Sequence, residues 1–302
     1  MTNENITPLT TYALAVLKTA SAHDKAYKTR DFATQWRRRQ EADKVIGIAE
    51  DVPARPARPE KPELLFPRDM PKRKKGNHDH NKINLLHALS HIELNAIDLA
   101  WDIIARFSYL YRSDVQARDA VTNTNINDGE NFSLPLAFYE DWLKVADDEA
   151  KHFLMLSTEL EKFGKAYGDL PAHDGLWESA EKTANDFAAR LAIVPMVLEA
   201  RGLDVTPNMI ELMKAQGDDD MAATLQIIYN DEVTHVQAGT VWFKKYCTHY
   251  NKNEELYFQE LVQNYFHATL KRPFNHPARE EAGMIRDWYE PLADIEYTQK
   301  KA

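Results

Sequence analysis

The chain has 302 residues, of which 44% are hydrophobic and 28% charged, and its formal net charge is −10. This charge argues against a protein that binds nucleic acid or anionic membrane over its whole surface. The single cysteine, Cys247, excludes an intrachain disulfide and a cysteine-rich metal cluster. No apolar run approaches the ~20 residues of a membrane span, and the amino terminus lacks the basic region of a secretory signal. We therefore expect a cytoplasmic protein that does not associate with membranes.

Helical patterns occupy most of the chain, and only ten glycines are present, which favours helices over turn-rich β structure. Two helices are predicted first, and six prolines between Pro53 and Pro71 then predict an extended strap. Gly202 follows the last periodic residue of the third long helix and predicts its end. The predicted helices span residues 7–22, 26–48, 82–111, 134–164, 176–201, 218–247, 253–270 and 278–290.

These elements predict an all-α fold built around a bundle of four long helices. Residues 1–81 would form an N-terminal helical arm and the proline-rich strap. Residues 82–250 would form the bundle. Residues 251–302 would form a C-terminal helical extension that packs on the bundle.

The phrase Asp-Glu-x-x-His occurs twice, at residues 148–152 and 231–235. Glu and His three residues apart lie on one face of a helix, close enough to bind the same metal ion. Apolar residues at helical spacing surround both phrases, so the pairs Glu149–His152 and Glu232–His235 should face the core. A buried carboxylate is costly unless a positive charge compensates it, and a metal ion does this directly.

The other two long helices each place one glutamate on an apolar stripe, Glu93 in the first and Glu199 in the third. Four carboxylates and two imidazoles on four successive helices are the ligand set of di-iron and di-manganese carboxylate bundles. The oxygen-rich set without thiolates favours Fe or Mn over Zn or Cu(I). Asp148 and Asp231 each stand four residues before a histidine. They are candidates to accept the N–H of a ligating imidazole and so to fix its tautomer.

Residues 91–100, both Asp-Glu-x-x-His phrases and the tail 271–279 together resemble a bacterial ferritin-like family whose function is unassigned. The resemblance covers nearly the whole chain, including residues 67–69 of the strap. Within the same superfamily, the arrangement is similar to the di-iron tRNA-modifying hydroxylases and, more distantly, to bacterial monooxygenases and ribonucleotide reductase small subunits. The resemblance implies a ferritin-like four-helix bundle with additional terminal helices. By motif, it assigns metal-ligand roles to Glu93, Glu149, His152, Glu199, Glu232 and His235.

Such a centre predicts a non-haem dimetal oxidase or monooxygenase. Two Fe ions, with Mn/Fe or Mn/Mn as alternatives, would let O₂ hydroxylate or oxidise a small organic substrate, a modified nucleoside or another metabolite. The four glutamates would be catalytic through the metals, and Glu93 and Glu199 would shift between terminal and bridging modes. The sequence has no dinucleotide-binding glycine motif and no cluster cysteines, so electrons would come from an external donor or from the substrate.

Two other functions are compatible with the same ligands. One is an iron- or manganese-binding ferritin-like protein with a ferroxidase or peroxide-detoxifying role. The other is a structural or partner-binding bundle with a vestigial site. The helical arms at both ends favour the oxygen-activating enzyme, because they could cover one end of a bundle and shape a pocket. The sequence leaves oligomerisation open.

Several further residues have two interpretations each. Tyr229, one turn before Glu232, is either a redox-active or proton-donating tyrosine or, as we favour, a packed core residue. His87 and His91 are either auxiliary ligands or, as we favour, packed and hydrogen-bonded. Pro195 is expected to disturb the helix beside Glu199, and Gly239 allows either a substrate channel or a close helix approach.

The basic residues 68–75 and Arg37–Arg39 could bind phosphates, as an RNA-modifying enzyme would need. Only Phe66 and Trp36 lie near enough in the sequence to stack on bases. We therefore favour solvated loops over a nucleic-acid site.

Overall fold

The computed structural model describes residues 6–71, 78–112, 132–266 and 269–293. These residues are mainly helical, with three isolated backbone bridges and no strand among them, which confirms the predicted all-α class. None of the described helices is long and apolar enough to cross a membrane. The chain divides into two compact units, unit 1 (Met1–Asp174) and unit 2 (Gly175–Ala302). This boundary falls inside the predicted bundle segment, and the predicted division at residues 81 and 250 stays a prediction.

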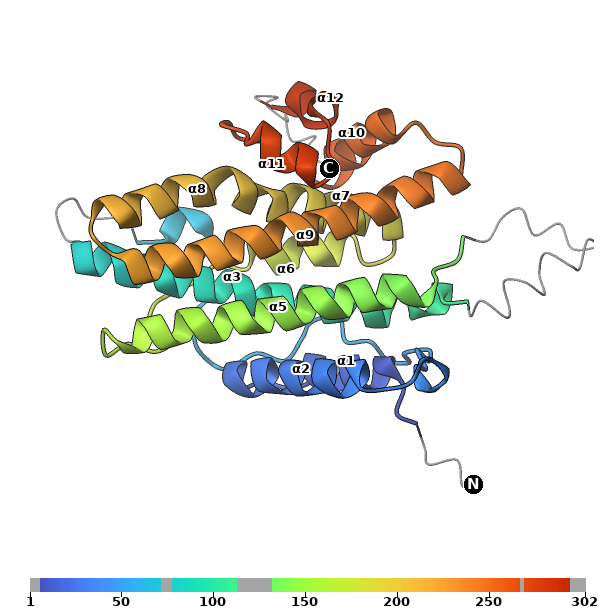
Figure 1. Ribbon diagram of the computed structural model, residues 1–302, viewed down its shortest axis with the longest axis horizontal. Helices are drawn as coiled ribbons and strands as arrows, with labels where there is room; N and C mark the ends of the chain where they lie inside the picture. Colours follow the sequence, from blue (N-terminus) through green and yellow to red (C-terminus); the bar gives the residue numbers. More distant parts are fainter. Residues whose placement is uncertain (1–5, 72–77, 113–131, 267–268, 294–302) are drawn as a thin grey trace, which may run out of the picture. The chain divides into compact units, whose positions relative to one another are not determined.

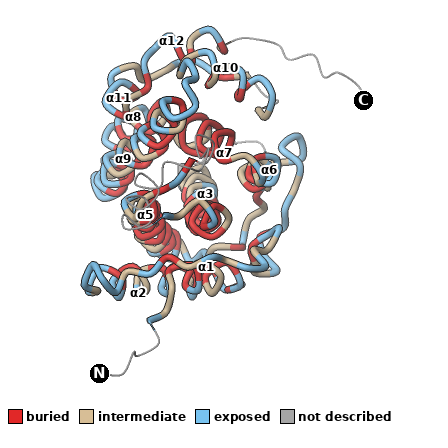
Figure 2. The backbone as a smooth tube through the Cα atoms, turned by 90° about the vertical axis from the view of Figure 1, so that its right-hand side faces the viewer, coloured by how far each residue is buried: buried red, intermediate tan, exposed pale blue. Residues whose placement is uncertain are grey.

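Unit 1 is built around two long helices, α3 and α5, that pack along their lengths. Two shorter helices lie beside this pair, with α2 against α5 and α1 against α3 (Figure 1). The buried residues of unit 1 concentrate along α3 and α5 (Figure 2). The helices are α1 (Leu9–Leu17), α2 (Ala22–Arg37), α3 (His78–Arg106) and α5 (Leu136–Glu161), with short turns η1 (Glu41–Asp43), η2 (Pro67–Asp69) and η3 (Ser108–Leu110).

The strap contains no regular element other than η2 within residues 44–71, as its prolines predict. The second predicted helix, 26–48, begins earlier and ends earlier than expected. Ser21 starts α2 because its hydroxyl accepts a hydrogen bond from the backbone N–H of Asp24. The helix ends at Arg37, and the following residues run as extended chain and one 3₁₀ turn.

Unit 2 contains a second long pair, in which the helical run α7–η4–α8 packs against α9. Three short helices follow α9; α10 packs on α7 and α9, and α11 on α8 and α9. The elements are α6 (Gly175–Lys182), α7 (Phe187–Ile193), the π-helical turn η4 (Val194–Glu199), α8 (Ala200–Ala215), α9 (Asp219–His249), α10 (Glu254–Tyr265), α11 (His276–Glu281), α12 (Arg286–Tyr289) and η5 (Glu290–Leu292).

The third predicted long helix, 176–201, starts within one residue of α6, but it is not continuous, and its predicted end at residue 201 is wrong. The short α6 stops at Lys182, and a new helix begins where the Asp186 carboxylate caps the backbone N–H of Ala189 at 2.9 Å. That helix continues through η4 and α8 to Ala215, so Gly202 lies within it and does not end it. Glu199 therefore lies near the middle of a long helical run.

Gly202 and Gly239 have different surroundings. A Cβ built on Gly239 of α9 would lie 2.4 Å from Cγ of Pro195 in η4, whereas a Cβ on Gly202 of α8 would lie 3.9 Å from Cγ of Glu232. The first distance is far below van der Waals contact and the second is an ordinary contact. Of the two roles predicted for Gly239, the structure thus supports close helix approach, with the rigid Pro195 ring against the glycine.

Replacing Gly239 with alanine is therefore expected to destabilise the protein by about 1–3 kcal/mol, the usual range for overpacking a core. Gly202→Ala is the matched control, because it adds the same methyl group to a helix in the same unit. It should be neutral or stabilising by about 0.5–1 kcal/mol, from the better helix propensity of alanine. Urea unfolding of both variants measures this difference, and equal stability of the two would contradict the close approach.

Candidate metal centre

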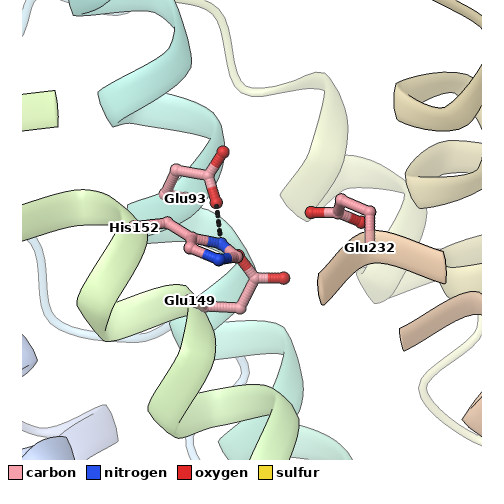
Figure 3. Close-up of side chains that lie close together, drawn as sticks. All are labelled: Glu93, Glu149, His152 and Glu232. Carbon is pink, nitrogen blue, oxygen red and sulfur yellow. Dashed lines mark hydrogen bonds and ion pairs between the residues drawn. The ribbon is translucent and has the colours of Figure 1, made fainter. Parts of the chain in front are cut away.

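Unit 1 brings together three of the predicted ligands, Glu93 from α3 and Glu149 and His152 from α5 (Figure 3). All three are buried. His152 Nδ1 lies 3.2 Å from a carboxylate oxygen of Glu93 and 3.4 Å from one of Glu149. Each residue offers one ligand atom, and these atoms lie within 4.8 Å of one another, so the group could hold a metal ion. We call these three residues the unit 1 half-site.

In the unit 1 half-site, the negative charge of one carboxylate disfavours ionisation of the other. Burial raises the pKa of Glu93 to about 8, and the neighbouring Glu149 charge acts in the same direction, while the hydrogen bond from His152 opposes them. Without a cation, Glu93 is therefore largely protonated near neutral pH. A divalent cation would replace this proton and compensate both carboxylates.

Unit 2 carries the corresponding residues Glu199, Glu232 and His235, which we call the unit 2 half-site. Glu232 and His235 are buried on α9 (Figure 3 draws Glu232), and His235 Nδ1 lies 3.8 Å from a carboxylate oxygen of Glu232. Glu199 is the last residue of η4 and is half-buried. Within the described part of unit 2, the three residues do not bring three ligand atoms within 4.8 Å of one another.

The π-helical turn was not predicted, although Pro195 indicated a disturbance at this place. A π-turn adds one residue to a helical turn, so it rotates the following side chains relative to a continuous α-helix. Proline at position 195 lacks the N–H that an α-helix needs, which suits it to such a turn. Glu199 thus obtains its direction from η4 rather than from a regular helical period.

The residues predicted to support the ligands occupy different environments. Asp148 accepts hydrogen bonds from Lys144 at 2.7 Å and Lys151 at 2.9 Å. Both Asp148 and Asp231 are half-buried, and their predicted role in orienting an imidazole stays a prediction. Tyr229 is also half-buried, and its hydroxyl accepts a hydrogen bond from the Asn275 side chain at 3.1 Å.

His87 and His91 of α3 are buried and hydrogen-bonded, as we favoured from the sequence. His87 Nε2 accepts a hydrogen bond from Gly168 N–H at 2.9 Å. Nδ1 of His91 lies 2.8 Å from the Tyr167 hydroxyl, and Nε2 lies 3.1 Å from the His173 carbonyl oxygen. Burial lowers the pKa of His87, and burial together with the charge of Arg58 lowers the pKa of His91 to about 4. Both rings are therefore neutral at physiological pH.

Two of the three arginines at 37–39 make contacts within unit 1. Arg37 pairs with the buried Asp147 of α5 at 2.6 Å, and Arg39 donates to the Thr7 carbonyl and the Tyr12 hydroxyl at 2.7 Å each. The basic run 68–75 lies partly outside the described residues. Nucleic acid therefore stays a partner that the sequence permits but does not favour.

Two buried acid–base pairs were missed from the sequence. Asp98 lies five residues after Glu93 and pairs with Arg58 of the strap at 3.0 Å, and with Lys25 of α2. Asp204 lies five residues after Glu199 and pairs with Arg279 of the tail at 2.7 Å. The repeated spacing Glu-x-x-x-x-Asp was the available signal. Each pairing joins residues that are far apart in the chain, which local patterns do not reveal.

Comparison with known proteins places the chain in a family. Residues 18–290 match the family described as "Protein of unknown function (DUF455)". An "Uncharacterized protein" of Haemophilus influenzae is 35% identical over 286 residues, which cover 94% of this chain and 93% of the relative. No solved structure matches the chain. The expected resemblance to a family of unassigned function is confirmed, while membership of the ferritin-like superfamily stays a prediction. The chain belongs to the DUF455 family.

Proposed function

We propose that the glutamates and histidines of the unit 1 and unit 2 half-sites bind two divalent metal ions, iron in the first place, and that the fold is a ferritin-like four-helix bundle. The protein would then be a cytoplasmic dimetal-carboxylate oxidoreductase that uses O₂ to hydroxylate or oxidise a small organic substrate. One observation carries this proposal: the same Glu-x-x-His pair is buried on a long helix in each unit, and a neighbouring helix in each unit supplies one more glutamate.

The chemistry of the donor set supports two ions and narrows their identity. Four carboxylates carry a total charge of −4, which matches two divalent cations when both imidazoles are neutral. Carboxylate and imidazole ligands without thiolates favour Fe or Mn over Zn or Cu(I). Bound iron would supply open coordination positions and electrons for the reduction of O₂, in the manner of other dimetal carboxylate bundles.

The chain's own residues would control protons and ligand movement. Glu93, whose pKa is about 8 in the absence of metal, would release its proton when a cation binds. Glu199 lies at the end of η4, and π-turns inside α-helices occur frequently at functional sites. We further propose that electrons come from an external donor and that the substrate is a small molecule such as a modified nucleoside.

The first experiment is metal content by elemental mass spectrometry, on protein purified from cells supplied with both Fe and Mn. The same sample is then reduced without oxygen and exposed to O₂ while its absorption spectrum is recorded. We expect about two Fe per chain and a transient absorption in the near-ultraviolet and visible. Two Mn that stay unchanged with O₂ would instead favour the peroxide-detoxifying alternative. No metal after reconstitution with either ion would overturn the proposal.

A further inference from the structure

The tail 271–279 was recognisable in the sequence but has no place among the proposed ligands. Its most buried charged contact is between Arg279 of α11 and Asp204 of α8. The Arg279 guanidinium donates from Nε to one carboxylate oxygen at 2.9 Å and from Nη2 to the other at 2.7 Å. Both residues are buried. A two-point contact of this kind fixes orientation as well as distance, because the planar fork matches the carboxylate.

Further hydrogen bonds connect the tail to the start of α8, next to Glu199. Arg279 Nη2 donates to the Ala200 carbonyl oxygen at 3.3 Å, at the residue that directly follows Glu199. Arg201 donates from Nη1 to the Lys271 carbonyl at 2.7 Å and to the Pro273 carbonyl at 3.1 Å. The tail is thus attached to α8 at the point where η4 gives way to the α-helix.

Asn275 extends this attachment from α8 to α9. Its side-chain N–H₂ donates to the Leu203 carbonyl at 3.0 Å and to the Tyr229 hydroxyl at 3.1 Å, and its backbone N–H donates to Asp204 at 2.9 Å. Tyr229 stands three residues before Glu232, less than one helical turn away. One asparagine therefore connects the two helices that carry Glu199 and Glu232.

The position of Asp204 explains how such contacts could act on a ligand. Five residues correspond to ~140° around an α-helix, so an aspartate five residues after a glutamate faces a different side. An arginine fork on that aspartate restrains rotation of the helix about its axis, and this rotation decides where the glutamate points. Unit 1 has a related contact without the two-point fork: Asp98, five residues after Glu93, pairs with Arg58 Nε at 3.0 Å, and Arg58 also donates to Asn95 at 2.8 Å.

We propose that the contacts of the tail with α8 and α9, which we call the clasp, hold the unit 2 ligands in their orientation. Arg279, Asp204 and Asn275 are then positioning residues for Glu199 and Glu232. The inference rests on the proposed metal centre and deepens it. A purely structural clasp would support folding alone. A positioning clasp also sets the affinity and the coordination geometry of the bound metal.

The test uses Co(II) alone as the metal, added to full-length, chelator-treated protein. The variants are Asn275→Ala, which cuts the link to α9 but leaves the Arg279–Asp204 pair, and Arg279→Lys, which keeps the charge but removes the fork. Lys271→Ala is the matched control, because the tail's contact there is through the backbone carbonyl. Visible absorption of bound Co(II) reports geometry, its titration reports affinity, and thermal unfolding of the metal-free protein reports stability.

We expect Asn275→Ala and Arg279→Lys each to weaken Co(II) binding by about 10-fold or more, the size typical of residues that support metal ligands, and to alter the Co(II) spectrum. Lys271→Ala should match the parent protein. Parent-like affinity and spectrum in both variants, with at most a lower unfolding temperature, would overturn the clasp while leaving the metal centre intact. If the parent protein itself binds no Co(II), the proposed function fails and the clasp with it.

Discussion

The variant Glu149→Gln is expected to lose its metal and yet to be more stable than the parent when both are metal-free. Glu149 is buried, and its charge is one of the causes that raise the pKa of Glu93 to about 8. An amide of the same shape cannot serve as an anionic ligand, so metal affinity should fall by more than the ~10–100-fold typical of supporting residues. The same change removes a buried like charge, which should stabilise the metal-free protein by about 1–2 kcal/mol.

The pH dependence of the metal-free protein follows from the same carboxyl pair. The folded-state pKa of Glu93 lies above its ordinary value of 4.5, so the folded protein keeps a proton that the unfolded chain has released between pH 4.5 and about 8. The free energy of unfolding should therefore fall as the pH rises through this window. Glu149→Gln should narrow this pH window and reduce the total fall, because the Glu149 charge then no longer adds to burial in raising the pKa of Glu93.

Further variants test the assignment of the metal ligands. Glu161→Gln changes an exposed residue at the end of the same helix and should alter neither metal content nor stability. Glu232→Gln removes a ligand of the unit 2 half-site and should also lower the total metal content. The double variant Glu149→Ala with Glu232→Ala should bind no metal in elemental analysis. Two metal ions per chain in that double variant would refute the ligand assignment.

The second large effect is expected at Asp98→Asn, outside the ligand set. Asp98 is fully buried in unit 1, where it accepts a hydrogen bond from the buried Lys25 and pairs with Arg58 at 3.0 Å. Burial lowers the pKa of Lys25, and the charge of Asp98 opposes this shift. Removal of the Asp98 carboxylate leaves buried positive charge without its observed partner. Such losses cost about 3–5 kcal/mol.

Urea unfolding monitored by circular dichroism measures this cost, with an unchanged denaturant slope as evidence that only stability has changed. The double variant Lys25→Met with Asp98→Asn should recover part of the loss, because it removes the buried ammonium together with its partner. Asp31→Asn on the exposed face of α2 is the control and should stay within about 0.5 kcal/mol of the parent. A loss below about 1 kcal/mol for Asp98→Asn would show that Lys25 and Arg58 do not depend on this carboxylate.

The local sequence determined the helical class of the chain and the phase of the helices that carry Glu93, Glu149 and Glu232. These residues were predicted to face the core, and they are buried. The prediction succeeded because helical periodicity is a local property: a side chain's direction follows from its spacing to apolar neighbours a few residues away. The proline strap was predictable for the same reason, since each proline restricts its own backbone.

Only the tertiary structure decided what Gly202, Gly239 and Pro195 do. A glycine such as Gly202 often ends a helix, yet Gly202 lies inside α8, close to the Glu232 side chain. Gly239 lacks a side chain, and the ring of Pro195 packs against it. The buried pairs Lys25–Asp98 and Asp204–Arg279 join residues 73 and 75 positions apart. Packing and buried charge depend on which distant segments meet, and the free energy of these contacts exists only in the folded chain. The apolar periodicity within one helix therefore does not predict these contacts.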